Sequence, residues 1–168
     1  MDKKFNNIGK RDILIFPKFQ NLYLIQEIRK KYDRLANLIE PHITVAFPFS
    51  DNNRNEDLIQ SLNNVVSTFE PFKIIFSGIS LTENNTIFLN CIEGKDKIIE
   101  LHDKIYETIL PTHLKKSINY IPHITLGTCD NIDFLQNFDY KFETIVNEIS
   151  IEQIGENEES IILKNIKL

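Results

Sequence analysis

Residues 41–44 read Pro-His-Ile-Thr, and residues 122–125 repeat the same four residues. An aliphatic residue follows each copy, Val45 after the first and Leu126 after the second. The chain holds only 4 histidines and 6 prolines among its 168 residues, so the repeat uses scarce residue types and stands well above chance. Similar elements are predicted around each copy, which indicates two related halves offset by about 80 residues rather than a solenoid.

The spacing within each copy is typical of a strand that carries two polar side chains on one face. In a strand, residues i and i+2 point to the same face, about 6.5–7 Å apart. His42 and Thr44 therefore share a face, and Ile43 points the other way; His123 and Thr125 are arranged alike. Burying such polar pairs without partners costs free energy. We therefore expect the two polar faces to meet across one groove.

Hydrophobic periodicity predicts alternating helices and strands along the whole chain. Short runs rich in β-branched residues indicate strands, and apolar residues three or four apart indicate helices. Pro48 is expected to end one strand, and residues 82–85 to form a hairpin turn. The predicted strands are 12–16, 42–47, 72–81, 86–92, 123–128, 142–154 and 160–167, and the predicted helices are 19–32, 55–69, 95–110 and a short one at 131–138.

Composition bounds the class of protein. A length of 168 residues fits one domain that buries a sizeable core, so we expect residues 1–168 to form a single domain of two halves, about 1–93 and 94–168. A net charge of −5 excludes a protein that coats long duplex nucleic acid through a strongly basic face. Two cysteines, Cys91 and Cys129, give neither a disulfide framework nor a cysteine-rich zinc site.

Location and assembly are expectations of the same kind. No apolar run approaches the length of about 18 residues that a membrane-spanning helix needs. The first residues, Met-Asp-Lys-Lys-Phe-Asn-Asn, lack the apolar run of a signal peptide, so we expect a cytoplasmic protein. A monomer is the default expectation.

Two imidazoles and two hydroxyls facing one groove suit in-line displacement at a phosphodiester. One imidazole can take a proton from the attacking water or hydroxyl, and the other can give a proton to the leaving oxygen. An ordinary histidine pKa of about 6.5 lets two copies hold opposite protonation states near neutral pH. The threonine hydroxyls can donate to the non-bridging phosphate oxygens. No metal and no other cofactor is needed for this chemistry, and the residues leave open which histidine is the base.

The doubled His-x-Thr-aliphatic pattern resembles the two-histidine (2H) phosphoesterase superfamily, and within it the bacterial 2′-5′ RNA ligase-like proteins and cyclic phosphodiesterases. This resemblance implies an α+β, bilobal, pseudo-two-fold fold, with two antiparallel sheets flanked by helices and the active groove between them. It implies that His42 and His123 form the acid–base pair and that Thr44 and Thr125 anchor the phosphate. It also implies a 2′,3′-cyclic or 2′-5′ phosphodiester substrate in a nucleotide or at an RNA end.

The chain departs from some members of that superfamily. Its four arginines include none close in sequence to either motif, and the two motifs continue differently, which makes RNA ligation the less expected activity. A phosphate- or nucleotide-binding module without turnover and a metal-dependent hydrolase stay open as alternatives. No Walker loop or His-Glu-x-x-His zinc motif is present.

Further residues near the motifs are candidates for substrate binding. Lys116 and Tyr120 lie on the 111–121 loop before the second motif, where a cation and an aromatic ring could contact a phosphate and stack on a base. Phe47 could stack on a base at the groove rim. Packing or solvation is the competing interpretation for all three. His102 and His113 are expected at the surface.

Overall fold

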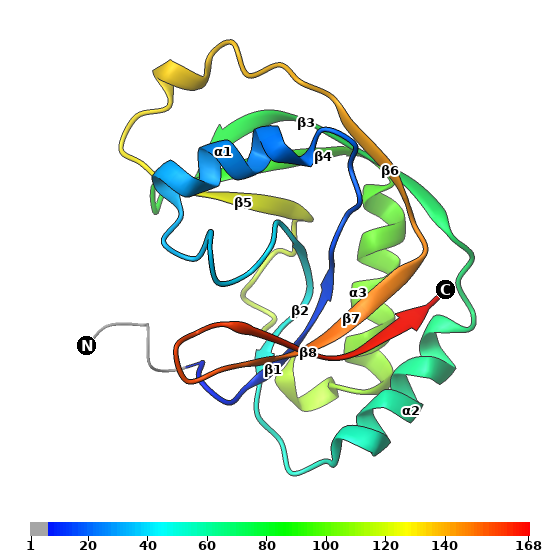
Figure 1. Cartoon of the computed structure of the whole chain (residues 1–168). Helices are drawn as coiled ribbons and strands as arrows, with labels where there is room; N and C mark the ends of the chain where they lie inside the picture. Colours follow the sequence, from blue (N-terminus) through cyan, green and yellow to red (C-terminus); the bar gives the residue numbers. More distant parts are fainter. Residues whose placement is uncertain (1–6) are drawn as a thin grey trace.

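Eight β-strands and three α-helices occur in residues 7–168, the part of the chain that the computed structural model describes (Figure 1). The fold class is α+β, with all strand pairs antiparallel. The elements are, in chain order, β1 (Arg11–Ile15), α1 (Leu22–Tyr32), β2 (Ile43–Phe49), α2 (Asn55–Val66), β3 (Phe72–Leu81), β4 (Thr86–Glu93), α3 (Lys95–Thr108), β5 (His123–Thr128), β6 (Phe142–Val146), β7 (Glu148–Ile154) and β8 (Ser160–Lys167).

The strands form one curled sheet in the order β6-β3-β4-β5-β2-β1-β7-β8. Pairing is extensive within the first four strands and within the last four, but β5 and β2 share a single registered pair, Ile43 with Ile124. The two sheets implied by the family resemblance are therefore two four-stranded halves of one sheet, joined at a narrow contact. Twist between neighbouring strands lets the halves diverge on either side of that contact.

The helices tie the two halves together. α1 connects β1 to β2 but packs on β5, and α3 connects β4 to β5 but packs on β2 (Figure 1). Their buried residues recur every three or four positions, as in Ile25 and Ile28 of α1 and Ile98, Leu101 and Ile105 of α3, so each helix presents one apolar stripe to the sheet. α2 packs against β8 and α3. Each of α1 and α3 thus crosses from its own half to the other.

Two strand predictions are wrong in detail. The predicted strand 142–154 breaks at Asn147 into β6, which pairs with β3, and β7, which pairs with β1 and β8. The apolar alternation continues through both pieces, so it could not reveal the change of partner. β2 also runs past Pro48 to Phe49, because the β1–β2 register shifts there and a bulge needs no amide donor from proline.

The predicted helices extend beyond the observed ones at one end. α1 begins at Leu22 because Phe19 lies in a turn, with its carbonyl 3.3 Å from the Leu22 amide. The helix predicted at 131–138 is a single 3₁₀ turn, Asp133–Leu135.

His102, expected at the surface, is buried on α3, where its Nδ1 lies 2.6 Å from the carbonyl oxygen of Val45.

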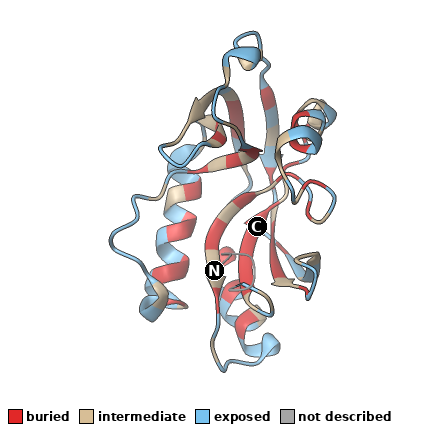
Figure 2. Cartoon of the chain, turned by 90° about the vertical axis from the view of Figure 1, so that its left-hand side faces the viewer, coloured by how far each residue is buried: buried red, intermediate tan, exposed pale blue. Residues whose placement is uncertain are grey.

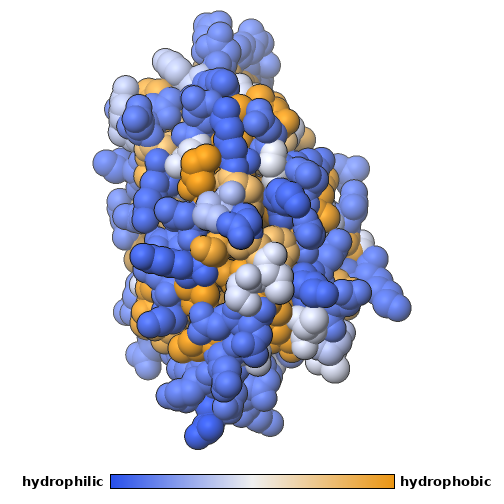
Figure 3. All heavy atoms as spheres, turned by 90° about the vertical axis from the view of Figure 1, so that its right-hand side faces the viewer, coloured by the Kyte–Doolittle hydropathy of each residue, from blue (hydrophilic) through white to orange (hydrophobic). Residues whose placement is uncertain are grey.

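Burial follows the alternation of the strands. In Figure 2 the buried residues line the inner face of the helices and run along the middle of the sheet. On the side seen in Figure 3, hydrophilic side chains cover most of the surface and apolar atoms show between them. Within residues 7–168, no helix combines the length and apolar character needed to cross a membrane.

Gly127 of β5 lies where the sheet and α1 approach most closely. Its φ is +135°, and a Cβ atom built there would lie 2.3 Å from the carbonyl carbon and oxygen of Tyr32, the last residue of α1. Both the backbone conformation and the close contact therefore require glycine. The contact fixes the C-terminal end of α1 beside the second His-x-Thr motif.

Gly127→Ala is expected to lower the free energy of unfolding by about 2–4 kcal/mol, because the methyl group must displace backbone atoms and the φ is strained. Gly9→Ala is the matched control, since Gly9 also has a positive φ, +78°, but nothing lies within 4 Å of its Cβ position. Its expected cost is about 1 kcal/mol. Urea unfolding of both variants measures the difference, and equal costs would contradict the close-approach argument.

Candidate active site

The register between β2 and β5 determines how the two motifs face each other. Because Ile43 is paired with Ile124 in antiparallel strands, His42 lies opposite Thr125 and Thr44 lies opposite His123. Ile43 and Ile124 are fully buried in the core, so the polar side chains point to the other face of the sheet. The structure therefore brings the four predicted residues to one face at the junction of the halves: His42, Thr44, His123 and Thr125.

Both imidazoles are held by the same backbone contact. Nδ1 of His42 lies 2.8 Å from the carbonyl oxygen of Glu40, and Nδ1 of His123 lies 2.7 Å from that of Ile121. A carbonyl oxygen only accepts, so each Nδ1 carries the proton and each neutral ring keeps its Nε2 lone pair free. The intervening residue is the proline of the motif, whose fixed φ holds carbonyl and imidazole in place. This explains why proline belongs to the repeat.

An aromatic ring limits the movement of each imidazole. Phe88 of β4 stacks on His123, with ring centroids 3.5 Å apart and planes inclined by 11°. Phe16, which follows β1, lies against His42 with centroids 6.1 Å apart and planes inclined by 58°. The two phenylalanines occupy comparable places, each on or just after the strand that neighbours a motif strand. They pack the rings and exclude water from one side.

The surroundings favour neutral imidazoles. Each ring is partly exposed to solvent, but protein atoms surround both closely enough for desolvation to dominate their pKa values. The pKa of His42 is lowered to about 4, mainly by burial and further by the charges of Arg29 and His123, while the bond to the Glu40 carbonyl and the Asp33 charge act in the opposite direction. Burial also lowers the pKa of His123, against the opposing effect of its bond to Ile121.

Arg29 is a buried cation whose charge acts on His42 of the first motif. Its side chain is 1% exposed, and it pairs with Asp33 at 2.8 Å. The guanidinium also donates to the carbonyl oxygen of Ile39 at 2.9 Å and to Oε1 of Gln26 at 3.1 Å. Ile39 directly precedes Glu40, whose carbonyl orients His42. Arg29 therefore both charges the surroundings of His42 and fixes the backbone that holds it.

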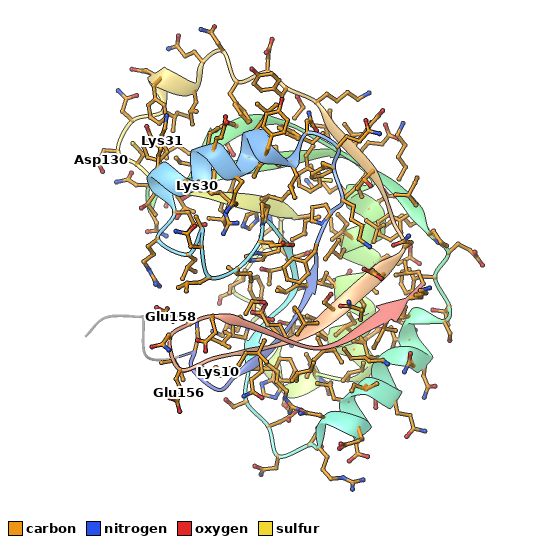
Figure 4. All side chains as sticks on the ribbon, in the orientation of Figure 1. Lys10, Lys30, Lys31, Asp130, Glu156 and Glu158 are labelled. Carbon is orange, nitrogen blue, oxygen red and sulfur yellow. The ribbon has the colours of Figure 1, made fainter. Side chains whose placement is uncertain are left out.

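Residues 33–40, the connector between α1 and β2, link the two halves. The Leu38 carbonyl accepts from the Ser160 amide at the start of β8, 2.9 Å away. The Arg34 guanidinium makes two contacts with the Glu158 carboxylate, at 2.7 and 2.9 Å. In Figure 4, Glu158 lies at the tip of the β7–β8 hairpin, on the same side of the molecule as Lys30 at the end of α1. The connector thus spans from α1 to that hairpin.

Two cavities lie along the connector, one in each half. The larger has a volume of about 560 Å³ and lies between residues 36–40 and strands β7 and β8. Phe16 and Glu40, both of which contact His42, lie in its wall. The smaller, about 200 Å³, is lined by residues 32–35 and by Thr125 of β5. The large cavity therefore shares its wall with two residues that contact His42, and the small cavity is lined by Thr125 itself.

The remaining predicted binding residues lie elsewhere. The Tyr120 hydroxyl donates to the Thr44 carbonyl at 2.8 Å, and its ring stacks on His102 with centroids 3.7 Å apart. Phe47 makes edge contacts with both rings of that pair. These contacts give Phe47 and Tyr120 packing roles beneath β2, against α3. Lys116 is exposed on its loop and lines neither of the two cavities.

Sequence reasoning missed Arg29 because the residue lies 13 positions before His42 on a predicted helix. The available signal was its place beside Ile25 and Ile28 on the apolar face, with Asp33 four residues later, a spacing that suits a helical ion pair.

Among residues 7–168, no group of three or more histidine, cysteine, aspartate or glutamate side chains could hold a metal ion.

Known proteins resemble this chain in sequence. A family model described as the 2′-5′ RNA ligase superfamily matches residues 16–153. A protein of Geobacillus kaustophilus, provisionally described as a phosphoesterase, is 29% identical over 70% of this chain and 68% of its own length. A provisionally described phosphoesterase of Oceanobacillus iheyensis is also 29% identical, over 70% of this chain and 69% of its own length.

Solved structures share the fold at low sequence identity. E. coli LigT complexed with 3′-AMP has a TM-score of 0.60 and 13% identity, over 95% of this chain and 98% of that one. The protein TT0787 of Thermus thermophilus has a TM-score of 0.67 and 12% identity, over 95% of this chain and 97% of that one. At these identities the similarity establishes the fold.

Arg29→Met is expected to raise the pKa of His42 from about 4 towards 6.5, because it removes a buried cation and leaves the Asp33 carboxylate without its partner. It should also cost about 3 kcal/mol of stability, since Asp33 and the Ile39 carbonyl lose their donor. Arg29→Lys keeps the charge and should leave the pKa low.

An NMR titration of the His42 ring measures the pKa, and urea unfolding measures the stability. Arg54→Met is the control, because Arg54 is exposed and pairs only locally with Asp57 on α2. An unchanged His42 pKa in Arg29→Met would show that Arg29 has no electrostatic influence on the site.

Proposed function

The chain belongs to the 2′-5′ RNA ligase superfamily, and from that premise we propose that it is a metal-independent phosphodiesterase that opens a 2′,3′-cyclic phosphate, or hydrolyses a 2′-5′ linkage, in a nucleotide or at an RNA end. The observation that carries the proposal is the matched pair of imidazoles on one face, each with Nδ1 bonded to a backbone carbonyl and Nε2 free. A binding protein would have no need of two free ring nitrogens poised for proton transfer.

The proposed reaction uses only groups of this chain and water. One imidazole Nε2 takes a proton from water as the water oxygen forms its bond to phosphorus. The bond from phosphorus to the ribose 3′-oxygen breaks, and the second imidazolium gives its Nε2 proton to that oxygen, leaving a 2′-phosphate. Thr44 and Thr125 donate hydrogen bonds to the two non-bridging oxygens, where charge develops.

The unequal surroundings of the histidines support a division of roles. His42 has the more strongly lowered pKa, and it lies near the Arg29 cation. At a pH between the two pKa values, the histidine with the lower pKa is mostly neutral and the histidine with the higher pKa is mostly protonated. His42 is therefore assigned as the base and His123 as the acid.

The same proposal extends to the architecture. The unit β1–α1–β2 and the unit β4–α3–β5 have the same order of elements, and each helix packs on the motif strand of the other unit. The pair Ser150–Asn165 on β7 and β8 matches the pair Ser80–Asn90 on β3 and β4, with side-chain hydrogen bonds of 2.8 and 2.9 Å. These correspondences support one bilobal, pseudo-two-fold domain.

His42→Ala and His123→Ala should each lower kcat/KM for a nucleoside 2′,3′-cyclic phosphate by about 10²–10⁴-fold, with chelator present throughout. On bis(p-nitrophenyl) phosphate, whose leaving group needs no proton, His123→Ala should retain most of the activity and His42→Ala should not. His113→Ala is the control, since His113 lies on a 3₁₀ turn after α3.

These assays also separate the alternatives. Binding of the cyclic nucleotide without product in the natural protein would favour a binding module, and loss of activity on chelation would favour a metal-dependent hydrolase. If activity on bis(p-nitrophenyl) phosphate were lost in His123→Ala and kept in His42→Ala, the assigned roles of base and acid would be reversed.

The kcat/KM profile is expected to be bell-shaped with its maximum below pH 6.5. Falling pH protonates the base as it passes the His42 pKa of about 4, and rising pH removes the proton of the acid at the lowered His123 pKa. The kcat profile should lie at higher pH, because the bound phosphate anion raises the pKa of both imidazoles. Rates measured from pH 3.5 to 9 test this, and a kcat/KM maximum above pH 7 would contradict it.

A further inference from the structure

The large cavity beside His42 has the size of a small-ligand site. Its volume of about 560 Å³ lies within the range of about 300–1,000 Å³ found for such sites and exceeds the space one water or ion needs. Leu38 and Glu40 of the connector form what we call the roof of the cavity. Strands β7 and β8 form its floor, which includes Asn165 and Ile162, and Phe16 also lines it.

The cavity adjoins the proposed reaction centre. Phe16 lies against the His42 ring, and the Glu40 carbonyl is bonded to Nδ1 of the same ring. The four motif residues do not line the cavity themselves, so a substrate whose phosphorus lies at His42 would extend into it past Phe16 and the backbone of Glu40. The roof is fastened, since the Ser160 amide of the floor donates to the Leu38 carbonyl of the connector.

The lining selects for an uncharged, hydrogen-bonding occupant. Its charged side chains are the carboxylates of Glu40 and Glu148 and the ammonium of Lys18, and Lys18 is already paired with Glu148 at 3.0 Å. The excess of negative charge repels a second phosphate. Phe16, Leu38 and Ile162 supply apolar surface, which suits the faces of a ring rather than a charged chain.

Polar groups on the floor can recognise the edge of such a ring. Ser150 Oγ donates to Asn165 Oδ1 at 2.8 Å, which orients the amide and leaves its Nδ2 group able to donate to a ligand. The Asn37 amide on the roof adds a donor and an acceptor. The matching pair Ser80–Asn90 in the other half has no role in this cavity, so the recognition is one-sided.

We propose that this cavity is the nucleoside subsite of the enzyme: it takes the uncharged base and ribose that carry the scissile phosphate, and its acidic lining excludes a further phosphate on that nucleoside. The inference rests on the proposed function. Among the substrates named in the proposed function, it favours a free nucleoside 2′,3′-cyclic phosphate over an RNA end, whose terminal nucleoside carries a 5′-phosphate.

Ile162→Trp fills the cavity, and Ile161→Trp is its matched control. The two isoleucines are neighbours on β8 with similar exposure, 43% for Ile162 and 40% for Ile161. Successive residues of a strand point to opposite faces, and of these two only Ile162 lines the cavity. Ile162→Trp should lower kcat/KM for uridine and adenosine 2′,3′-cyclic phosphate at least tenfold, the scale of losing apolar pocket contacts. Its activity on ethylene phosphate, a cyclic diester without a nucleoside, should stay within about twofold of the natural protein.

Two further measurements complete the test. The natural protein should prefer adenosine 2′,3′-cyclic phosphate over its 5′-phosphorylated form, and NMR shifts on adding uridine or adenosine should be lost in Ile162→Trp and kept in Ile161→Trp. Equal effects of both tryptophans, or an equal loss on ethylene phosphate, would overturn the subsite. If the natural protein hydrolyses neither the nucleoside 2′,3′-cyclic phosphates nor ethylene phosphate, the proposed function fails. The NMR shifts on adding uridine or adenosine then support or overturn the subsite by themselves.

Discussion

The contact between Ile43 and Ile124 is the constraint on which the site depends. These two residues are the registered pair between β2 and β5, and through them two four-stranded halves become one sheet. A shift of one residue would turn every side chain of one motif to the opposite face, placing a histidine in the apolar core and an isoleucine in the groove. The cost of that exchange fixes the register. The core thereby determines the positions of the polar groups.

The crossing helices protect this narrow contact. A single residue pair contributes little pairing energy, but α1 and α3 each leave their own half and pack on the motif strand of the other. Separating the halves would expose the apolar stripes of both helices, at roughly 25 cal/mol for each Å² of apolar surface returned to water. The face that carries the four motif residues therefore needs no further β-pairing between β2 and β5, because the helices hold the two halves together.

Much of this architecture could be predicted from local patterns, and the exceptions have physical causes. The strands of the two motifs and the helices on either side follow the apolar periodicity, and His42, Thr44, His123 and Thr125 share one face as the two-residue spacing requires. The break at Asn147 could not be found, since alternation encodes the face of a strand and not its partner. The place of Arg29 on the apolar face of its helix could have marked it as buried, but its link to His42 could not be predicted, because that link arises from the fold of the connector.

The repeat of the motif gives the two histidines the same local geometry, and the rest of the chain makes them different. Proline, carbonyl and imidazole are arranged alike in both copies. The connector passes beside His42, and with it come the buried Arg29 cation and the roof of the large cavity; His123 has instead the close stack of Phe88. Acid–base catalysis of displacement needs two groups in opposite protonation states. In the proposed reaction, the repeated motif supplies the two groups, and the connector, present beside His42 alone, supplies the difference between them.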